Sequence, residues 1–155
     1  MTEKRRDLPT SDELAIWREH LETFEVVRAR IASRLQHDAG LSSGDYRVLL
    51  ALTEAEGRSL RSSRLAELIG WERSRLSGQL GRMERRGLLR REPCAEDARG
   101  SNVVLEDAGA DAFRASTMPH LRAIKDVFVD AFTRDELAAL AAASRAMRTH
   151  LQSTS

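Results

Sequence analysis

The sequence predicts a mainly α-helical protein with one small β-hairpin and long helices toward both ends. Three observations support this fold class. Apolar residues recur at the spacing of one helix face through most of the 155 residues. Glycines and capping residues divide these periodic segments into separate helices. Near the middle, residues 88–105 hold two short apolar runs around a polar tip, which is the pattern of a β-hairpin.

The first expected helix covers residues 12–39 and follows a polar tail at residues 1–11. Ser11 is a residue type that caps helix N-termini, and Gly40 is a residue type that ends helices. One face of this helix is apolar, and its members are Leu14, Trp17, Leu21, Phe24, Ile31 and Leu35.

A second, shorter helix is expected to begin after Ser42, which can cap it together with Asp45 in a capping box. Gly57 is the expected end of this helix. Residues 59–61 then offer a short strand that can pair with the hairpin.

Two helices separated by a tight turn follow in residues 61–87. Gly70 makes the turn, because glycine tolerates a positive φ. The apolar face of the first helix comprises Leu65, Leu68 and Ile69, and that of the second comprises Leu76, Leu80 and Met83. Gly87 ends the second helix, and Leu88 and Leu89 open a strand whose return partner is residues 101–105, with a polar tip at residues 93–100. A helix–turn–helix followed by a hairpin is the outline of a winged DNA-binding unit.

The outer face of the second of these helices is small, hydroxylated and cationic. Residues 71–91 contain seven arginines against two glutamates and carry a net charge of +5, whereas the whole chain is only +1. The positive charge is therefore concentrated where a DNA backbone would lie. Gly78 and Gly81 weaken the helix by about 1 kcal/mol each, which favours a close approach by a ligand. A solvated amphipathic helix is the alternative interpretation.

The C-terminal part predicts two more helices. The first spans residues 107–131, and Pro119 is expected to kink or split it. Residues 133–136 form a capping box for the last helix, whose apolar stripe has near-heptad spacing and comprises Leu137, Leu140, Met147 and Leu151. Together with the first helix, this stripe predicts a homodimer that pairs through both ends of the chain. Packing within one chain is the alternative.

Composition excludes several classes of protein. A single cysteine excludes an internal disulfide, and no apolar run approaches the roughly 18 residues that a membrane span needs. The first residues lack the apolar segment of a signal peptide, which favours the cytoplasm. The four histidines have no i, i+4 spacing, and no catalytic or phosphate-binding motif is present. The sequence predicts no enzyme, no metal site and no cofactor.

The segment LAELIGWERSRLSGQLGRMERRGLLRRE resembles the recognition region of the MarR family of winged helix-turn-helix regulators. The segment DARGSNVVLEDAG resembles the wing signature of that family, an Asp, an Arg two residues later and a strand ending in Leu. The resemblance covers about residues 12–152 and is strongest over residues 60–110. This chain departs from the family pattern at Glu72, where Ser or Thr is usual, and at Glu106, where Thr is usual.

The resemblance implies a transcriptional regulator, expected to be a repressor, that binds a near-palindromic operator in double-stranded DNA as a homodimer. It divides the chain into a tail and dimerisation helix at residues 1–40, a DNA-binding region at residues 41–106 and dimerisation helices at residues 107–155. Two rivals stay open. One is a ligand- or redox-sensing interaction protein on the same fold with weak DNA affinity, and the other is a small α-helical enzyme that uses scattered His and Glu residues.

The outer face of the second helix supplies the expected DNA contacts. Base edges are assigned to Arg75, Ser77 and Arg82, a base or phosphate contact to Ser74, and phosphates to Arg73 and Arg85, with Gly78 allowing close approach. Arg99 is expected in the minor groove. Asp97 either orients Arg99 or acts as a turn residue.

Two further assignments remain open between a functional and a structural role. By resemblance, Trp17, Phe24 and Tyr46 line a crevice for a small aromatic or phenolic effector, and core packing explains them equally well. Cys94 has arginines nearby in the sequence that favour a reactive thiolate, and an ordinary cysteine is the alternative.

Overall fold

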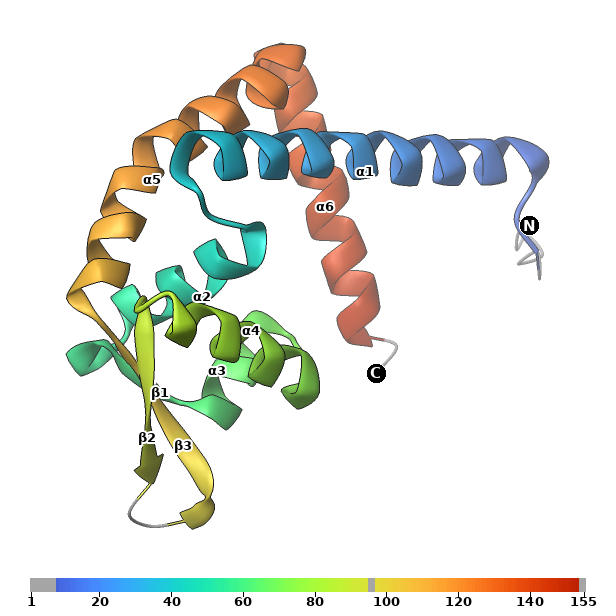
Figure 1. Cartoon of the computed structure of the whole chain (residues 1–155). Coiled ribbons are helices and arrows are strands. Elements are labelled where there is room, and N and C mark those ends of the chain that lie inside the picture. Colours follow the sequence, from blue (N-terminus) through green and yellow to red (C-terminus); the bar gives the residue numbers. More distant parts are fainter. Residues whose placement is uncertain (1–7, 95–96, 154–155) are drawn as a thin grey trace.

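The computed structural model describes residues 8–94 and 97–153, and their side chains except at positions 94 and 97–99. Two helices cross at one end of the molecule, and the hairpin projects at the other end (Figure 1). The fold class is confirmed as mainly helical with a small antiparallel sheet. The elements in chain order are α1 (Ser11–Ala39), α2 (Ser43–Glu54), a 3₁₀ turn (Glu56–Arg58), β1 (Ser59–Arg61), α3 (Ser62–Ile69), α4 (Arg73–Arg85), β2 (Leu89–Cys94), β3 (Asp97–Leu105), α5 (Asp107–Val127), a 3₁₀ turn (Val129–Ala131) and α6 (Arg134–Ser153).

The cap of α1 lies one residue earlier than expected. Thr10, not Ser11, is the N-cap, because Glu13 stands three residues after it and closes a reciprocal capping box. The Thr10 N–H donates to Glu13 Oε2 at 2.6 Å, and the Glu13 N–H donates to Thr10 Oγ1 at 3.2 Å. Ser11 has Leu14 at the corresponding position, which cannot accept. Gly40 ends the helix with φ 65°, as predicted.

The start of α2 is confirmed and its expected end is wrong. Ser42 and Asp45 form the predicted capping box, with hydrogen bonds of 3.0 and 2.9 Å. The helix stops at Glu54 rather than at Gly57, because Ala55 adopts an extended conformation. This earlier turn lets β1 pair with β3, as expected for residues 59–61.

The sheet has the order β1-β3-β2 and is antiparallel throughout. Leu60 faces Val103, and Leu89 faces Leu105, so the apolar part of each strand points to the core. The strands continue into the expected polar tip at residues 93–100, since β2 reaches Cys94 and β3 begins at Asp97. The tip is therefore shorter than predicted, because backbone pairing does not require apolar side chains.

One buried cluster joins the C-terminal end of α1 to α2, α3, α4, the sheet and α5. The expected core residues Leu65, Ile69, Leu76, Leu80 and Met83 belong to it. The expectation for Leu68 is wrong, because its side chain is 52% exposed. Ala66 takes its place, so the buried arc of α3 is centred between Leu65 and Ile69.

Helix α5 packs along α1 and runs through Pro119 without a break, so the expected split is wrong. Proline in a helix interior removes one backbone hydrogen bond and crowds the preceding turn, and the packing of α5 against α1 offsets this cost. The helix ends at Val127, four residues before the expected end, and a 3₁₀ turn follows. Thr133 and Glu136 form the predicted capping box of α6.

Helix α6 stands apart from the winged region (Figure 1). None of its described residues is buried, and its apolar stripe remains open, with Met147 at 55% exposure. Helix α1 is also largely exposed, and Trp17 is 57% accessible. Large parts of both stripes that predict a dimer are thus uncovered in a single chain, although Leu35 at the end of the α1 stripe is buried in the core.

Candidate nucleic-acid interface

Helix α4 lies between α3 and the hairpin and presents its cationic face to solvent. Gly70 makes the predicted turn with φ 66°, and the Trp71 N–H donates to Ala66 O at 2.9 Å. The buried residues Leu76, Leu80 and Met83 anchor α4 to the core. Because these three face inward, the opposite side of α4 is free for a ligand.

The predicted DNA contacts of α4 are all exposed, namely Arg73, Ser74, Arg75, Ser77, Gly78, Arg82 and Arg85. A Cβ added at Gly78 would meet only the Nη1 atom of Arg82, at 3.7 Å, so the surface there is open. Gly81, which was expected on the same outer face, is half-buried. The structure therefore gathers the seven predicted residues of α4 on one accessible surface.

Ion pairs divide the arginines of this region into two groups. Arg86 pairs with Asp45 at 2.8 Å, Arg91 with Glu84 at 2.6 Å, and Arg90 with Glu92 and Glu106 at 2.8 and 2.7 Å. Among the described residues, no acidic side chain pairs with the other four arginines, which are Arg73, Arg75, Arg82 and Arg85. The uncompensated charge is therefore on α4 itself.

The base of the hairpin is less cationic than its sequence suggests. The Arg91 side chain donates to Glu84, and its backbone N–H also donates to Glu84 Oε1 at 2.9 Å. The hydrogen bonds from Arg91 hold the pKa of the Glu84 carboxyl below its usual value. The glutamates that neutralise Arg90 and Arg91 come from α4, β2 and the start of α5, so only the fold shows the pairing.

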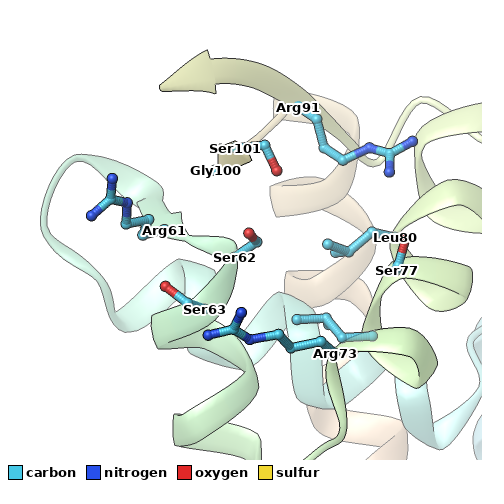
Figure 2. A pocket seen from close by; sticks show the side chains of 10 residues that line it. Arg61, Ser62, Ser63, Arg73, Ser77, Leu80, Arg91, Gly100 and Ser101 are labelled. Carbon is cyan, nitrogen blue, oxygen red and sulfur yellow. The ribbon is translucent and has the colours of Figure 1, made fainter. Parts of the chain in front are cut away.

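A polar hollow of about 620 Å³ lies between α3, α4 and the hairpin (Figure 2). Arg73 extends from α4 toward the start of α3, where Ser62 and Ser63 line the hollow (Figure 2). The hairpin contributes Arg91, Gly100 and Ser101. Hydroxyl and guanidinium groups around an open hollow suit phosphate oxygens. Ser62, Ser63 and Ser101 are not among the residues that the sequence predicts for the site, because a serine outside a motif carries no spacing signal.

Aromatic stacking orients Arg75. Its guanidinium carbon lies 4.2 Å from the centroid of the Trp71 ring, a cation–π distance. Arg47 approaches the same ring at 5.6 Å and donates to Ile69 O at 2.8 Å. Trp71 thus supports one predicted base contact from the turn that precedes α4.

Arg82 is oriented by a different contact. Its Nη2 donates to Gln79 Oε1 at 2.6 Å, and Gln79 Nε2 donates to Asp45 Oδ1 at 2.6 Å. Asp45 and Gln79 are only 3% and 6% exposed. Asp45 was expected only as a capping residue of α2, and sequence gave no sign of Gln79, since 34 residues separate the two.

The three predicted effector residues have different surroundings. Phe24 lines an apolar groove between α1 and α6 with His20 and Phe128. Tyr46 instead packs between α2 and α5, with ring centroids 5.2 Å from Phe113 and 4.3 Å from His120. Burial raises the pKa of Tyr46, with a smaller effect from Glu54, and burial lowers the pKa of His120. Trp17 lies on the exposed face of α1.

Some predicted features fall outside what the structure describes. The side chains of Cys94, Asp97 and Arg99 are among those not described, although positions 97 and 99 lie on β3. The described residues contain no group of three or more His, Cys, Asp or Glu side chains placed to hold a metal ion. No helix in the described part of the chain combines the length and apolar character needed to cross a membrane.

Comparison with known proteins agrees with this geometry. The family model described as "MarR family" matches residues 39–100. AbsC, a MarR family transcriptional regulator from Streptomyces coelicolor, is 34% identical, with a TM-score of 0.82 over 96% of this chain and 99% of that one. Sco3205, a MarR family transcriptional regulator from the same organism solved in complex with DNA, is 31% identical, with a TM-score of 0.83 over 94% and 92% of the two chains. A search of curated proteins finds no match. Since both sequence and fold agree over nearly the full length of these regulators, the chain belongs to the MarR family of transcriptional regulators.

Proposed function

We propose that the protein represses transcription by binding a pseudo-palindromic operator in double-stranded DNA as a homodimer. The observation that carries this proposal is the division of the arginines. Arg86, Arg90 and Arg91 have acidic partners, whereas the four on the outer face of α4 have no such partner among the described residues. A cationic helix surface left uncompensated by its own fold suits an anionic partner. The relative Sco3205, solved in complex with DNA, supports that choice.

In the proposed complex α4 enters the major groove. Arg75, Ser77 and Arg82 contact base edges, and Ser74 adds a base or phosphate contact. Arg73 and Arg85 bind phosphates and set the position of α4 without selecting sequence. Gly78 leaves room for the DNA, and the hollow beside Arg73 accommodates the backbone. Arg99, supported by Asp97, enters the minor groove from the hairpin.

A homodimer is supported by the exposed stripes of α1 and α6. An apolar groove of about 570 Å³ runs between these helices, lined by Phe24, Phe128, Leu137, Leu140, Met147 and other residues of α6. We propose that residues 1–40 and 107–155 form the dimer contact, and that residues 41–106 bind DNA. A two-fold dimer presents two α4 helices to half-sites about one helical turn apart, roughly 34 Å.

Release by a small aromatic or phenolic effector remains part of the proposal. Tyr46, Phe113 and His120 form an aromatic cluster between the winged region and α5, which is where a bound ring could alter the relation of the two parts. Trp17 and Phe24 lie on α1, away from that cluster. In the alternative, the same fold senses a ligand or the redox state and binds DNA only weakly. We place the protein in the cytoplasm, where it has access to DNA.

The test is a binding isotherm on DNA enriched by the protein from a randomised duplex library. We expect the enriched duplex to bind at least tenfold more tightly than random duplex, and the affinity for both to fall steeply with salt. An enriched pool without a common half-site, or an affinity insensitive to salt, would favour the ligand- or redox-sensing alternative.

A further inference from the structure

We propose that Asp45 and Gln79 are positioning residues that set the DNA sequence preference of the protein. They act by holding the guanidinium of Arg82 in one orientation through a hydrogen-bonded chain from Asp45 to Gln79 to Arg82. This inference rests on the proposed function, because it requires that Arg82 contacts a base edge. Neither Asp45 nor Gln79 touches DNA in this arrangement.

The chain of hydrogen bonds runs from the core to the surface. Asp45 Oδ1 accepts from Gln79 Nε2 at 2.6 Å, and Gln79 Oε1 accepts from Arg82 Nη2 at 2.6 Å. Asp45 and Gln79 are buried, whereas Arg82 is exposed on the face of α4 that we assign to DNA. The contact therefore links the first turn of α2 directly to the DNA-binding surface.

Only one orientation of the Gln79 amide is favourable between Asp45 and Arg82. A carboxylate can only accept hydrogen bonds, so it requires the NH₂ group of Gln79 to face inward. The carbonyl oxygen of the amide must then face outward, where it meets a donor from Arg82. A reversed amide would place its oxygen against the carboxylate and its NH₂ against a guanidinium that can only donate. The acid at position 45 thus decides which group Gln79 offers at the surface.

Asp45 is itself fixed by two further hydrogen bonds. Its Oδ2 atom accepts from the Ser42 N–H at 2.9 Å and from Arg86 Nη1 at 2.8 Å. Arg86 Nη2 also donates to Gly40 O at 2.8 Å, which ties the end of α1 to the same site. These partners compensate the buried charge of Asp45, so the carboxylate has a defined position from which to orient Gln79.

Gln79 is closely packed on the side that faces α2. A Cβ added at Gly44 would lie 3.2 Å from both Cδ and Oε1 of Gln79. The α2 backbone at Gly44 therefore packs directly against the amide group of Gln79. Gly44 allows this approach because it has no side chain. The burial of Gln79 and its hydrogen bond to Asp45 therefore define the position of the oxygen that Arg82 meets.

Arg82 keeps the capacity to contact DNA while it is held. A guanidinium has five N–H donors, and the bond to Gln79 uses one of them. The others can still meet the acceptors of a guanine, which lie at a fixed spacing. Because the side chain is oriented before binding, little of its rotational freedom is lost on the cognate base. Because the Arg82 side chain is held, it does not reorient to match a base with a different acceptor pattern. The preference for the cognate base therefore increases.

Arg85 provides the internal contrast. It lies one turn from Arg82 on the same helix and is exposed. Among the described residues, neither a carboxylate nor an amide orients its guanidinium. An arginine of this kind can adjust to a phosphate of any sequence. We therefore expect Arg82 to control preference and Arg85 to control overall affinity.

The test exchanges the two partners of the buried hydrogen bond. Asp45→Asn keeps an oxygen for the Ser42 N–H and Arg86 and turns an NH₂ group toward Gln79, so the Gln79 amide no longer favours its carbonyl oxygen on the Arg82 side. Gln79→Glu places a second carboxylate against Asp45. The double variant Asp45→Asn/Gln79→Glu rebuilds the chain of hydrogen bonds, because the new amide donates to the new carboxylate, which in turn accepts from Arg82. The new carboxylate also partly neutralises Arg82, so this variant should bind both duplexes more weakly, and only the ratio of the two affinities reports the recovered orientation.

The measured quantity is the ratio of affinities for the enriched duplex and for random duplex, determined with the same protein preparation. This ratio is independent of the folded fraction, so a loss of stability alone does not change it. We expect Arg82→Ala and each single variant to lower this ratio roughly tenfold. We expect the double variant to recover most of the lost preference. Arg85→Ala is the matched control and should weaken both duplexes equally.

The outcomes separate this inference from the proposed function. If Arg82→Ala lowers the ratio and the single variants do not, the positioning role is wrong while the function stands. Single variants that lower the ratio without recovery in the double variant would also overturn it. If Arg82→Ala leaves the ratio unchanged, the positioning role is again overturned. A wild-type protein with no preference for any duplex would refute the proposed function, and the inference with it.

Discussion

At the scale of single residues, the partner of each arginine decides what it can do. Arg86, Arg90 and Arg91 are engaged by carboxylates and stabilise the contacts between elements. The guanidinium of Arg82 donates a hydrogen bond to the neutral amide of Gln79, which orients the side chain and leaves its charge uncompensated. Arg73 has neither kind of partner among the described residues and lines the polar hollow. Charge counted along the sequence does not distinguish these three situations.

The first prediction concerns Arg73 and Arg90. Arg73→Ala should flatten the dependence of log affinity on log salt by about one unit per half-site, because one phosphate contact is lost. Arg90→Ala removes the same charge from the same region and is the control. Its guanidinium is held by Glu92 and Glu106, so its removal should leave the slope unchanged. Equal slopes for the two variants would mean that ion pairing does not separate these arginines.

The second prediction concerns His120. Burial lowers the pKa of its imidazole. The unfolded chain then binds a proton more tightly than the folded chain, so stability falls as the pH drops through the unfolded value of about 6.5 toward the lowered folded value. His120→Phe keeps a ring beside Tyr46 and removes this titration. Thermal melting between about pH 7 and pH 5 should show a smaller loss of stability for the variant than for the wild type. A parallel loss in both proteins would contradict the assignment.

At the scale of elements, α3 and α4 depend on their buried faces. Helix α3 has eight residues, which is too short for stability in isolation, and α4 contains two glycines. Their position therefore comes from Leu65, Ile69, Leu76, Leu80 and Met83 in the core. The exposed surface of α4 can be polar and glycine-rich because the buried surface carries the packing.

The third prediction compares two leucines of this region. Leu80→Asp places an unpaired charge in the core, which is severely unfavourable, so the cooperative melt and DNA binding should be lost together. Leu68→Asp is the control, because its side chain is 52% exposed. This variant should melt within about 1 kcal/mol of the wild type. Circular dichroism and the binding isotherm distinguish the two, and a folded Leu80→Asp protein would disprove the orientation of α4.

The fourth prediction concerns the hairpin. Minor-groove contacts depend on groove width, which is small in A·T-rich DNA, where the negative potential is concentrated. Arg99→Ala should therefore cost more affinity on operators with A·T-rich flanks than on those with G·C-rich flanks. Asp97→Ala should give a smaller loss in parallel, and a double-mutant cycle measures whether the two act as a pair. A loss that ignores the flanks would make Arg99 a simple phosphate contact.

At the scale of the whole molecule, large parts of the apolar surfaces of α1 and α6 remain without cover in one chain. Exposed Trp17, Leu21 and Met147 are large apolar side chains on these helices. Such surfaces favour association with a partner of the same kind. Two-fold association would also place two copies of α4 on one DNA duplex, which a single chain cannot do.

The fifth prediction tests this association. The double variant Leu137→Glu/Leu140→Glu places two charges in the groove between α1 and α6, and it should shift the solution mass from a dimer to a monomer. Ala142→Glu adds a charge to α6 at a residue that does not line the groove, and it should remain dimeric. Light scattering at micromolar concentration measures both. A wild-type protein with the mass of a monomer would refute the dimer.

Several local features of this fold are determined by the sequence alone. The capping boxes at Ser42 and Thr133 and the glycine turns at Gly40 and Gly70 agree with the structure, because each depends on residues within four positions of one another. The apolar periodicity of α4 likewise placed its outer face and the exposed arginines. Local hydrogen bonds and helix phase need no knowledge of distant partners.

Only the tertiary structure decided which groups meet across elements. In the folded chain Leu68 is exposed, and α5 continues through Pro119. Gln79 meets Asp45, and Arg90 meets Glu106. Each of these outcomes depends on how two elements pack, and sequence spacing does not fix the distance between elements. The sequence therefore shows how many arginines are present, whereas packing decides how much of their charge is available to a partner. The reason is that a carboxylate within about 3 Å neutralises a guanidinium wherever the carboxylate lies in the sequence.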